Sequence, residues 1–297
     1  MTWTKEDMHQ QSGKNIIITG TNNDIGFETS LALAEKGAIV ILAVPDLNKG
    51  KAVREKIISL VPNAKVDVMY LDFHDLSTIQ DFVKEYKSKY HTLSILILQE
   101  SIRTSKLQTT KEGFEAHFGM NYLGQFALTG LLLDLLKKTP NSRVITIGNK
   151  ISNKTKLSFG YFKGSKDVKG EAFYNQSKLA MMLFAKHLDE KFKKHHLHTV
   201  SICCQPLTVS SMDDSKKRRS FVKIVGKKNE ENKNEGISPI LFAATEHSLT
   251  GGEYIGLPKN KNNSPIDLKT LDQLYDENVA HNLWQLSEKL CGITYRF

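Results

Sequence analysis

The stretch "NIIITGTNNDIGFETSLALAEKG", residues 15–37, decides the fold. It begins with a short run rich in isoleucine, passes through a glycine turn, and continues with apolar residues at three- and four-residue steps. The run is typical of a buried strand, and the spacing predicts a helix. A glycine turn between the two lets backbone amides and the positive end of the helix approach a phosphate group. The stretch therefore predicts a strand, a phosphate-binding turn and a helix.

The same alternation continues along the chain. Further apolar runs lie at 38–43, 65–71, 94–98, 143–148 and 199–204, and segments with helical spacing lie between them. Strands that are apolar on both faces and alternate with helices predict a parallel sheet covered on both sides. We therefore expect a doubly wound α/β fold in a single domain, 1–297. Ligands of such sheets bind beyond the carboxyl ends of the strands.

The composition is that of an ordinary globular protein, with 40% hydrophobic and 25% charged residues. No apolar run reaches the roughly 18 residues that a membrane span needs. Residues 1–15 are polar and unlike a signal or transit peptide. The sequence thus predicts a cytoplasmic protein without a membrane span. Cys203 and Cys204 are neighbours in an apolar run and are expected to be buried, reduced thiols.

The net charge of +9 comes largely from dispersed lysines, which argues against a nucleic-acid partner. The one dense basic run, 216–219, is interpreted as a solvated loop, with a nuclear address or an anionic ligand as alternatives. His195, His196 and His198 have no acidic or thiol residue near them in the sequence, so no metal site is predicted.

Two motifs resemble the fingerprint of the short-chain dehydrogenase/reductase family, T-G-x-x-x-G-x-G followed by Y-x-x-x-K. They are "TGTNNDIG" at 19–26 and "YNQSK" at 174–178. The stretches "NYLGQFALTGLLL", "GGEYIG" and "LWQLSEKLCGITY" extend the similarity to a soluble bacterial branch related to retinol dehydrogenases, from about Ser12 to Tyr295.

This resemblance implies a Rossmann-type fold of about seven strands with helices on both faces. It also implies an NAD or NADP cofactor, a small-molecule alcohol or carbonyl substrate, and a homodimer or homotetramer. The segment 207–250 is expected to form a lid over the substrate as an excursion from the same domain.

In the phosphate turn, Gly20 and Gly26 match the first and third glycines of the family, and Asn22 and Ile25 also match. The middle glycine is replaced by Asp24. A carboxylate repels a pyrophosphate, and its Cβ stands where close backbone approach is wanted. Reduced dinucleotide affinity is expected, unless Asp24 turns outward and caps the helix.

The positions that select the cofactor carry neither family determinant. Val44 stands where NAD enzymes have an acid, and Pro45 where NADP enzymes have an arginine. Lys49 and Lys51 lie close by and could attract a 2′-phosphate, so NADP is slightly favoured over NAD. Asp72 matches the acid that the family places near the adenine.

Two further motifs depart from the family pattern. Residues 98–101, "LQES", replace N-N-A-G after the fourth strand, which adds bulk and charge near the nucleotide. After the sixth strand, Pro206 keeps the proline of a P-G motif and Leu207 replaces its glycine. Ser211 matches a threonine that meets the carboxamide of the cofactor.

The predicted catalytic residues are Tyr174, Lys178, Asn121 and Asn149. A four-residue spacing places Tyr174 and Lys178 on one face of a helix. A free tyrosine has a pKa of about 10, and a nearby ammonium group, together with a positive nicotinamide ring, brings it down. By resemblance the tyrosine is the general acid, the lysine also holds the nicotinamide ribose, and Asn121 supports a proton-supplying water chain. Asn149 replaces the serine that binds the substrate carbonyl, and its amide can still donate.

Two functions fit these residues. The first is a nicotinamide-dependent oxidoreductase that uses Asn149 in place of serine. The second is a dehydrogenase-like protein that has lost turnover and serves as a binding or regulatory scaffold, which the altered motifs favour. For Asn121 alone, a structural role that caps or kinks its helix is the simpler interpretation.

Overall fold

The computed structural model describes residues 3–160, 162–164, 170–206, 230–257 and 265–297, with the side chains of 230–235 outside that description. The strands are β1 Asn15–Thr19, β2 Ile39–Val44, β3 Lys65–Tyr70, β4 Ile95–Leu98, β5 Arg143–Ile147, β6 Val200–Gln205, β7 Tyr254–Gly256 and β8 Ile266–Asp267. The helical elements are η1 Lys5–Asp7, α1 Asp24–Glu35, α2 Leu47–Leu60, α3 Leu76–Lys89, α4 Ala116–Phe118, the π-helical turn η2 Gly119–Leu123, α5 Gly124–Lys138, α6 Gly170–Lys194, α8 Glu230–Thr245, α9 Thr270–Leu274 and α10 Glu277–Cys291.

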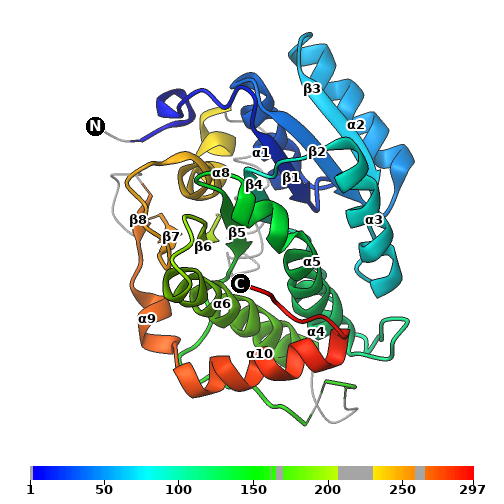
Figure 1. Cartoon of the computed structure of the whole chain (residues 1–297), viewed down its shortest axis with the longest axis vertical. Helices are drawn as coiled ribbons and strands as arrows, with labels where there is room; N and C mark the ends of the chain where they lie inside the picture. Colours follow the sequence, from blue (N-terminus) through cyan, green and yellow to red (C-terminus); the bar gives the residue numbers. More distant parts are fainter. Residues whose placement is uncertain (1–2, 161, 165–169, 207–229, 258–264) are drawn as a thin grey trace, which may run out of the picture.

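The strands form one sheet in the order β3-β2-β1-β4-β5-β6-β7-β8 (Figure 1). The pairs from β3 to β7 are parallel, and β8 is antiparallel to β7. This confirms the Rossmann-type fold and the six strands expected from apolar runs. The sheet has eight strands where about seven were expected, because β8 is a two-residue edge strand with no apolar run to signal it.

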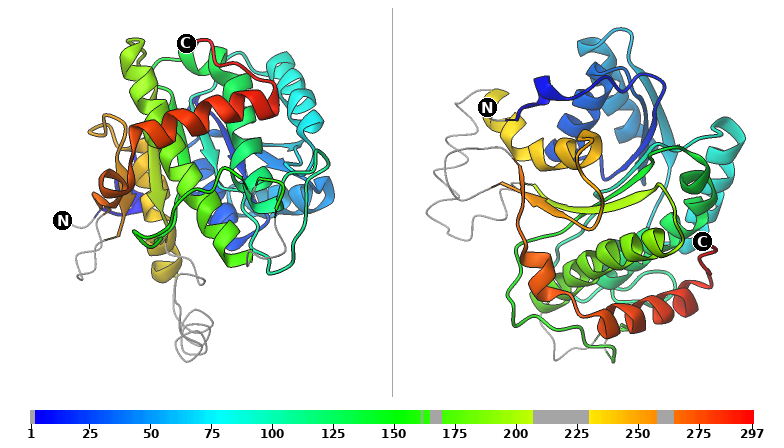
Figure 2. Two further views of the ribbon diagram at one scale, coloured as in Figure 1. Left: turned by 90° about the horizontal axis from the view of Figure 1, so that it is seen from below. Right: turned by 60° about the vertical axis from the view of Figure 1, so that its left-hand side comes forward.

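Helices cover both faces of the sheet, as Figure 2 shows. One apolar cluster packs α3, α5, α6 and α10 on one face, and a second packs α1, α2 and α8 on the other. The chain order reverses where β1 pairs with both β2 and β4. Doubly wound sheets bind ligands at such a reversal, outside the carboxyl ends of the strands. The loops after β1, β2 and β4 are therefore where the site is sought.

The segment predicted as a lid, 207–250, includes a helix of the core. Ile240 and Leu241 of α8 are fully buried against the sheet. The part of the prediction at 207–229 lies outside the described residues, as does the basic run 216–219. Among the helices that are described, none is both long and apolar enough to cross a membrane.

The helix expected over 118–138 is interrupted by the π-helical turn η2, at whose centre Asn121 lies. A π-helical turn inserts one extra residue into a helix and is frequent at functional sites. At the junction with α5, a Cβ on Gly124 would lie 2.7 Å from Cδ1 of Phe73. The turn thus sits where the chain packs too closely for an ordinary side chain.

Candidate active site

The phosphate turn has the geometry that its glycines predict. Gly20 has a φ of +72°, and a Cβ added to Gly26 would lie only 2.4 Å from the Gly20 carbonyl oxygen. Only a glycine lets the start of α1 lie this close to the turn. Asn23 caps the helix by accepting a hydrogen bond from the Gly26 amide at 2.9 Å.

Asp24 is exposed and is the first residue of α1, so it turns outward as one alternative required. The other half of that alternative is wrong, because Asn23 and not Asp24 caps the helix. Asn22 is exposed and Ile25 packs against the apolar cluster behind the turn. Helix geometry leaves the amides of Asp24 and Ile25 without intrahelical acceptors, free to meet an anion.

The residues after β4 brace the phosphate turn. The hydroxyl of Thr19 accepts hydrogen bonds from the amides of Gln99 at 2.9 Å and Glu100 at 3.0 Å. The buried Gln99 side chain donates to the Gly20 carbonyl and to Asn23, each at 3.4 Å. The altered fourth-strand motif therefore supports the turn from behind.

Glu100 carries the added charge that was expected to oppose a nucleotide. Burial raises the pKa of its carboxyl, the nearby Asp72 raises it further, and Lys178 lowers it. A raised pKa favours the neutral carboxyl, which reduces the repulsion. Asp72, the predicted adenine-side acid, accepts a hydrogen bond from the His74 amide at 2.9 Å. The glycine cradle and the free helix amides fit a dinucleotide, with Asp24 as the charge that weakens binding.

Three of the predicted catalytic side chains meet at the ends of β5 and α6. The Asn149 amide donates to the Tyr174 hydroxyl at 3.4 Å. Lys178 Nζ lies 5.8 Å from the centroid of the Tyr174 ring and donates to the Ile147 carbonyl at 3.4 Å. Burial lowers the pKa of Lys178 to about 8, against the opposing influence of Cys203, Cys204 and Glu100.

The orientation of Asn149 is fixed by its own backbone. Its side-chain oxygen accepts from the Lys150 amide at 2.8 Å, so its NH₂ group faces Tyr174. The assignment of oxygen and nitrogen follows from this hydrogen-bond network. Gly148 precedes it in a tight fit, because a Cβ there would lie 2.8 Å from Cys203 Sγ. Asn149 thus presents a donor where the family places a serine hydroxyl.

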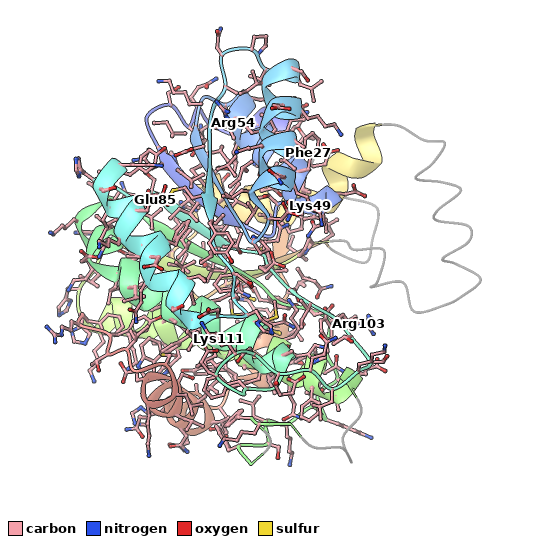
Figure 3. The ribbon with its side chains drawn as sticks, turned by 90° about the vertical axis from the view of Figure 1, so that its right-hand side faces the viewer. Phe27, Lys49, Arg54, Glu85, Arg103 and Lys111 are labelled. Carbon is pink, nitrogen blue, oxygen red and sulfur yellow. The ribbon has the colours of Figure 1, made fainter. Side chains whose placement is uncertain are left out.

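The pKa of Tyr174 differs from the expectation. Burial raises it, and the largest opposing influence is the charge of Arg103 rather than Lys178. The Arg103 guanidinium carbon lies 5.0 Å from the centroid of the Tyr174 ring, and Arg103 pairs with Glu171 at 3.3 Å. Figure 3 places Arg103 in the loop beyond β4, on the same side of the molecule as Lys49 at the start of α2. Sequence reasoning missed Arg103, because no motif marks it.

Asn121 ties three elements together. It is fully buried, and its side chain accepts from the Ile102 amide at 2.7 Å and donates to the Ile102 carbonyl at 3.0 Å. It also donates to Ser177 at 3.1 Å. These bonds support the structural interpretation of Asn121, although it neither caps a helix nor acts on one element alone. Its role in a water chain stays a prediction.

A buried pair beneath Tyr174 was also missed. His117 Nδ1 lies 2.7 Å from Glu115 Oε1, and His117 Nε2 accepts from the Thr104 amide at 3.1 Å. The His117 ring packs edge-on against Tyr174 with centroids 6.0 Å apart. The sequence "FEAHF" gives no signal for it, since the partners only meet when the loop after β4 folds over α4.

The remaining predicted positions are these. Pro206 is buried directly after β6, while Leu207 and Ser211 lie outside the described residues. Cys203 and Cys204 are buried, unpaired thiols, as expected.

Comparison with known proteins gives the class of this chain. The family model described as short chain dehydrogenase matches residues 14–220. Human polyprenol dehydrogenase is 31% identical over 288 residues, covering 93% of this chain and 84% of that protein. The WW domain-containing oxidoreductase of Gallus gallus is 32% identical over 289 residues, covering 94% and 68%. Human retinol dehydrogenase 11 is 35% identical over 202 residues, covering 68% and 63%.

Solved structures agree. An uncharacterized protein from Mycobacterium paratuberculosis superposes with a TM-score of 0.79 at 25% identity, and the match covers all of both chains. A short chain dehydrogenase from Shigella flexneri, complexed with NADP, has a TM-score of 0.62 at 16% identity, covering 84% of this chain and 99% of that one, which bears on the fold alone.

The chain belongs to the short chain dehydrogenase family and is an oxidoreductase of that type with retinol dehydrogenase-like relatives. Members of this family bind NAD or NADP and act on small molecules. The bacterial part of the predicted relationship is not tested by these matches.

Proposed function

We propose that the protein catalyses hydride transfer between a nicotinamide cofactor and an alcohol or carbonyl compound, with Tyr174 as the general acid and base. The observation that supports this best is the approach of the Asn149 amide to the Tyr174 hydroxyl at 3.4 Å, next to a buried Lys178. A reactive phenol with a donor and an ammonium beside it is suited to proton transfer at a carbonyl.

In the direction of reduction, a bound NADH or NADPH supplies the hydride. Tyr174 donates its proton to the carbonyl oxygen as the electron pair of the C=O bond moves onto that oxygen. The Asn149 amide donates a hydrogen bond to the same oxygen. Lys178 and Arg103 stabilise the phenolate that is left behind, because opposite charges close to a phenolate favour it.

NADP is the proposed cofactor. Asp46, the acid nearest the end of β2, accepts from the amides of Asn48 at 3.0 Å and Lys49 at 3.1 Å. Because this carboxylate caps α2, it is engaged away from a ribose diol. The Lys49 side chain is exposed and lies 3.7 Å from Asp46. An exposed ammonium at this place favours a 2′-phosphate. We therefore expect Lys49→Ala to weaken NADPH binding several-fold and to leave NADH binding unchanged.

The experiment titrates NADH and NADPH against thermal unfolding and intrinsic fluorescence. A ligand that binds the folded state must stabilise it, so a saturable rise in Tm is expected. A panel of aldehydes and alcohols, including retinal, polyprenols and short polar carbonyls, then gives the substrate class. The relatives' names make retinoids and polyprenols the first compounds to try.

Tyr174→Phe removes only the hydroxyl and should lower kcat by about 10²- to 10⁴-fold. Ser152→Ala serves as the control, since Ser152 is exposed and its hydroxyl accepts from the Lys154 amide at 3.2 Å. If neither dinucleotide raises Tm, the proposed enzyme function is wrong and the scaffold function takes its place. If turnover survives Tyr174→Phe, the acid has been assigned to the wrong residue.

A further inference from the structure

Ser101 holds a hydroxyl for which the fold gives no other use. It follows β4 at the position where the family pattern has a glycine. Its Oγ is buried, and no group among the described residues forms a hydrogen bond with it. A buried hydroxyl without a partner is unfavourable, so such a group in a folded protein usually serves a ligand or a reaction.

The hydroxyl of Ser101 lies beside Tyr174. Burial raises the pKa of Tyr174, and the charge of Arg103, the Asn149 amide and the Ser101 hydroxyl each lower it. The phenol oxygen therefore has donors from two loops next to it, one after β4 and one after β5. A carbonyl oxygen that approaches the phenol to take its proton comes within reach of both.

The backbone on each side of Ser101 is held in place. The Gln125 side chain donates to the Glu100 carbonyl at 2.8 Å. Asn121 bonds both backbone groups of Ile102, at 2.7 and 3.0 Å. The residues before and after Ser101 are thus fixed by buried amides, and the hydroxyl needs no rearrangement to act. Preorganised donors of this kind are the ones that contribute most to catalysis.

The same network joins this loop to the helix that carries the tyrosine. Asn121 donates to the Ser177 hydroxyl at 3.1 Å, and Ser177 donates to the Tyr174 carbonyl at 2.8 Å. A chain of three hydrogen-bonded residues therefore fixes the Ser101 loop relative to Tyr174. The structural work of Asn121 acquires a purpose, which is to hold Ser101 and Tyr174 in register.

We propose that Ser101 is a further catalytic residue that hydrogen-bonds the substrate oxygen protonated by Tyr174, replacing the hydroxyl that this chain lacks at Asn149. The inference rests on the proposed function. In reduction, hydride adds to the carbonyl carbon, the C=O electron pair moves to oxygen, and that oxygen takes the Tyr174 proton. Ser101 keeps its own proton and donates a hydrogen bond to the developing alkoxide. Two donors, an amide and a hydroxyl, then act where the family uses a serine.

The test compares Ser101→Ala and Ser101→Thr with the exposed control Ser152→Ala. Loss of one donor to a developing oxyanion lowers kcat by about 10²- to 10³-fold. We expect that loss in Ser101→Ala with little change in KM for the dinucleotide, partial retention in Ser101→Thr, and no loss in the control. In a protein that already carries Asn149→Ser, the effect of Ser101→Ala should shrink, since the restored hydroxyl would share the work.

A second measurement does not depend on turnover. The tyrosines are replaced by 3-fluorotyrosine, and the ¹⁹F resonance of position 174 is identified by its absence in Tyr174→Phe. Its pKa should rise in Ser101→Ala and stay unchanged in Ser152→Ala. The charged and titratable groups that face this phenol are Arg103 and Glu171 at the loop, His117 from α4 and Lys178 from α6, and all four are the same in both variants.

The outcomes are separable. A wild-type protein that reduces carbonyls while Ser101→Ala reduces them equally well overturns the role of Ser101 and leaves the proposed function standing. A wild-type protein with no turnover on any carbonyl refutes the proposed function and the catalytic role together. An unchanged ¹⁹F pKa in Ser101→Ala shows that the hydroxyl does not reach the phenol, and this too refutes the inference.

Discussion

His117 and Glu115 form a fully buried pair, 2.7 Å apart, on which the catalytic face of Tyr174 rests. The imidazole has a partner at each nitrogen, because Nε2 accepts from the Thr104 amide at 3.1 Å. Glu115 likewise uses its second oxygen to accept from the Phe118 amide at 2.9 Å, which caps α4. The pair therefore holds the loop after β4 against the short helix below it.

His117→Ala should destabilise the protein by about 3 to 5 kcal/mol, from a cavity and two buried polar groups left unpaired. Chemical denaturation measures the change. Lys111→Ala, which breaks the exposed pair between Lys111 and Asp75, is the control and should change stability little. Equal effects in the two variants would mean that the buried pair contributes nothing special.

Gly26→Ala should separate the need for a close backbone approach from simple helix propensity. The new Cβ would meet the Gly20 carbonyl oxygen at 2.4 Å, so α1 must move away from the turn. Overpacking of this kind costs about 1 to 3 kcal/mol, and the displaced amides should lose dinucleotide affinity by at least tenfold. In Gly160→Ala the Cβ meets nothing within 4 Å, and neither quantity should change. Isothermal titration with NADPH and thermal unfolding provide both readings.

The fold could be predicted because its signals are local. Each parallel strand from β1 to β6 is an apolar run, and burial on both faces leaves no other interpretation. β8 escaped because it is a two-residue antiparallel edge, and α8 was taken for part of an excursion because charged residues precede its buried half.

The site could be predicted only where a motif spans a few residues. Tyr174 and Lys178 lie one turn apart on α6, and Gly20 and Gly26 flank one turn. Arg103, His117 and Ser101 reach Tyr174 across the fold from a loop and a short helix more than fifty positions away in the sequence. Nothing in their own neighbourhood announces such a contact, because it is made by tertiary packing.

Asp24→Gly should strengthen dinucleotide binding. Asp24 is exposed at the first residue of α1, and the cap at Asn23 survives its removal. Repulsion between an exposed carboxylate and a pyrophosphate is worth about 1 kcal/mol, so Kd should fall by roughly fivefold. Asp24→Asn removes the charge and keeps the Cβ, which separates the two contributions. The gain should fade at high salt, because exposed charges are screened. Unchanged or weaker binding in Asp24→Gly would contradict the repulsion argument.

Lys178→Met should stabilise the protein while it abolishes turnover. Burial lowers the pKa of Lys178 to about 8 from an ordinary 10.5, so below pH 8 the folded protein carries a buried ammonium at a cost of up to about 3 kcal/mol. Methionine fills a similar volume without the charge, and the control Lys194→Met, exposed on the same helix, should leave stability unchanged.

The pH dependence gives this prediction its sign. Between pH 8 and 10.5 the unfolded chain holds a proton on this lysine that the folded chain has lost, so the free energy of unfolding rises with pH. Wild-type stability should therefore gain about 1 kcal/mol on Lys194→Met and wild-type proteins between pH 7.5 and 9, relative to Lys178→Met. This window ends before the buried Cys203, whose pKa is raised to about 11 and whose contribution has the opposite slope, begins to dominate. A gap between wild type and Lys178→Met that stays constant with pH would show that Lys178 is not ionised against its surroundings, and its role beside Tyr174 would then have to be that of a neutral hydrogen-bond donor.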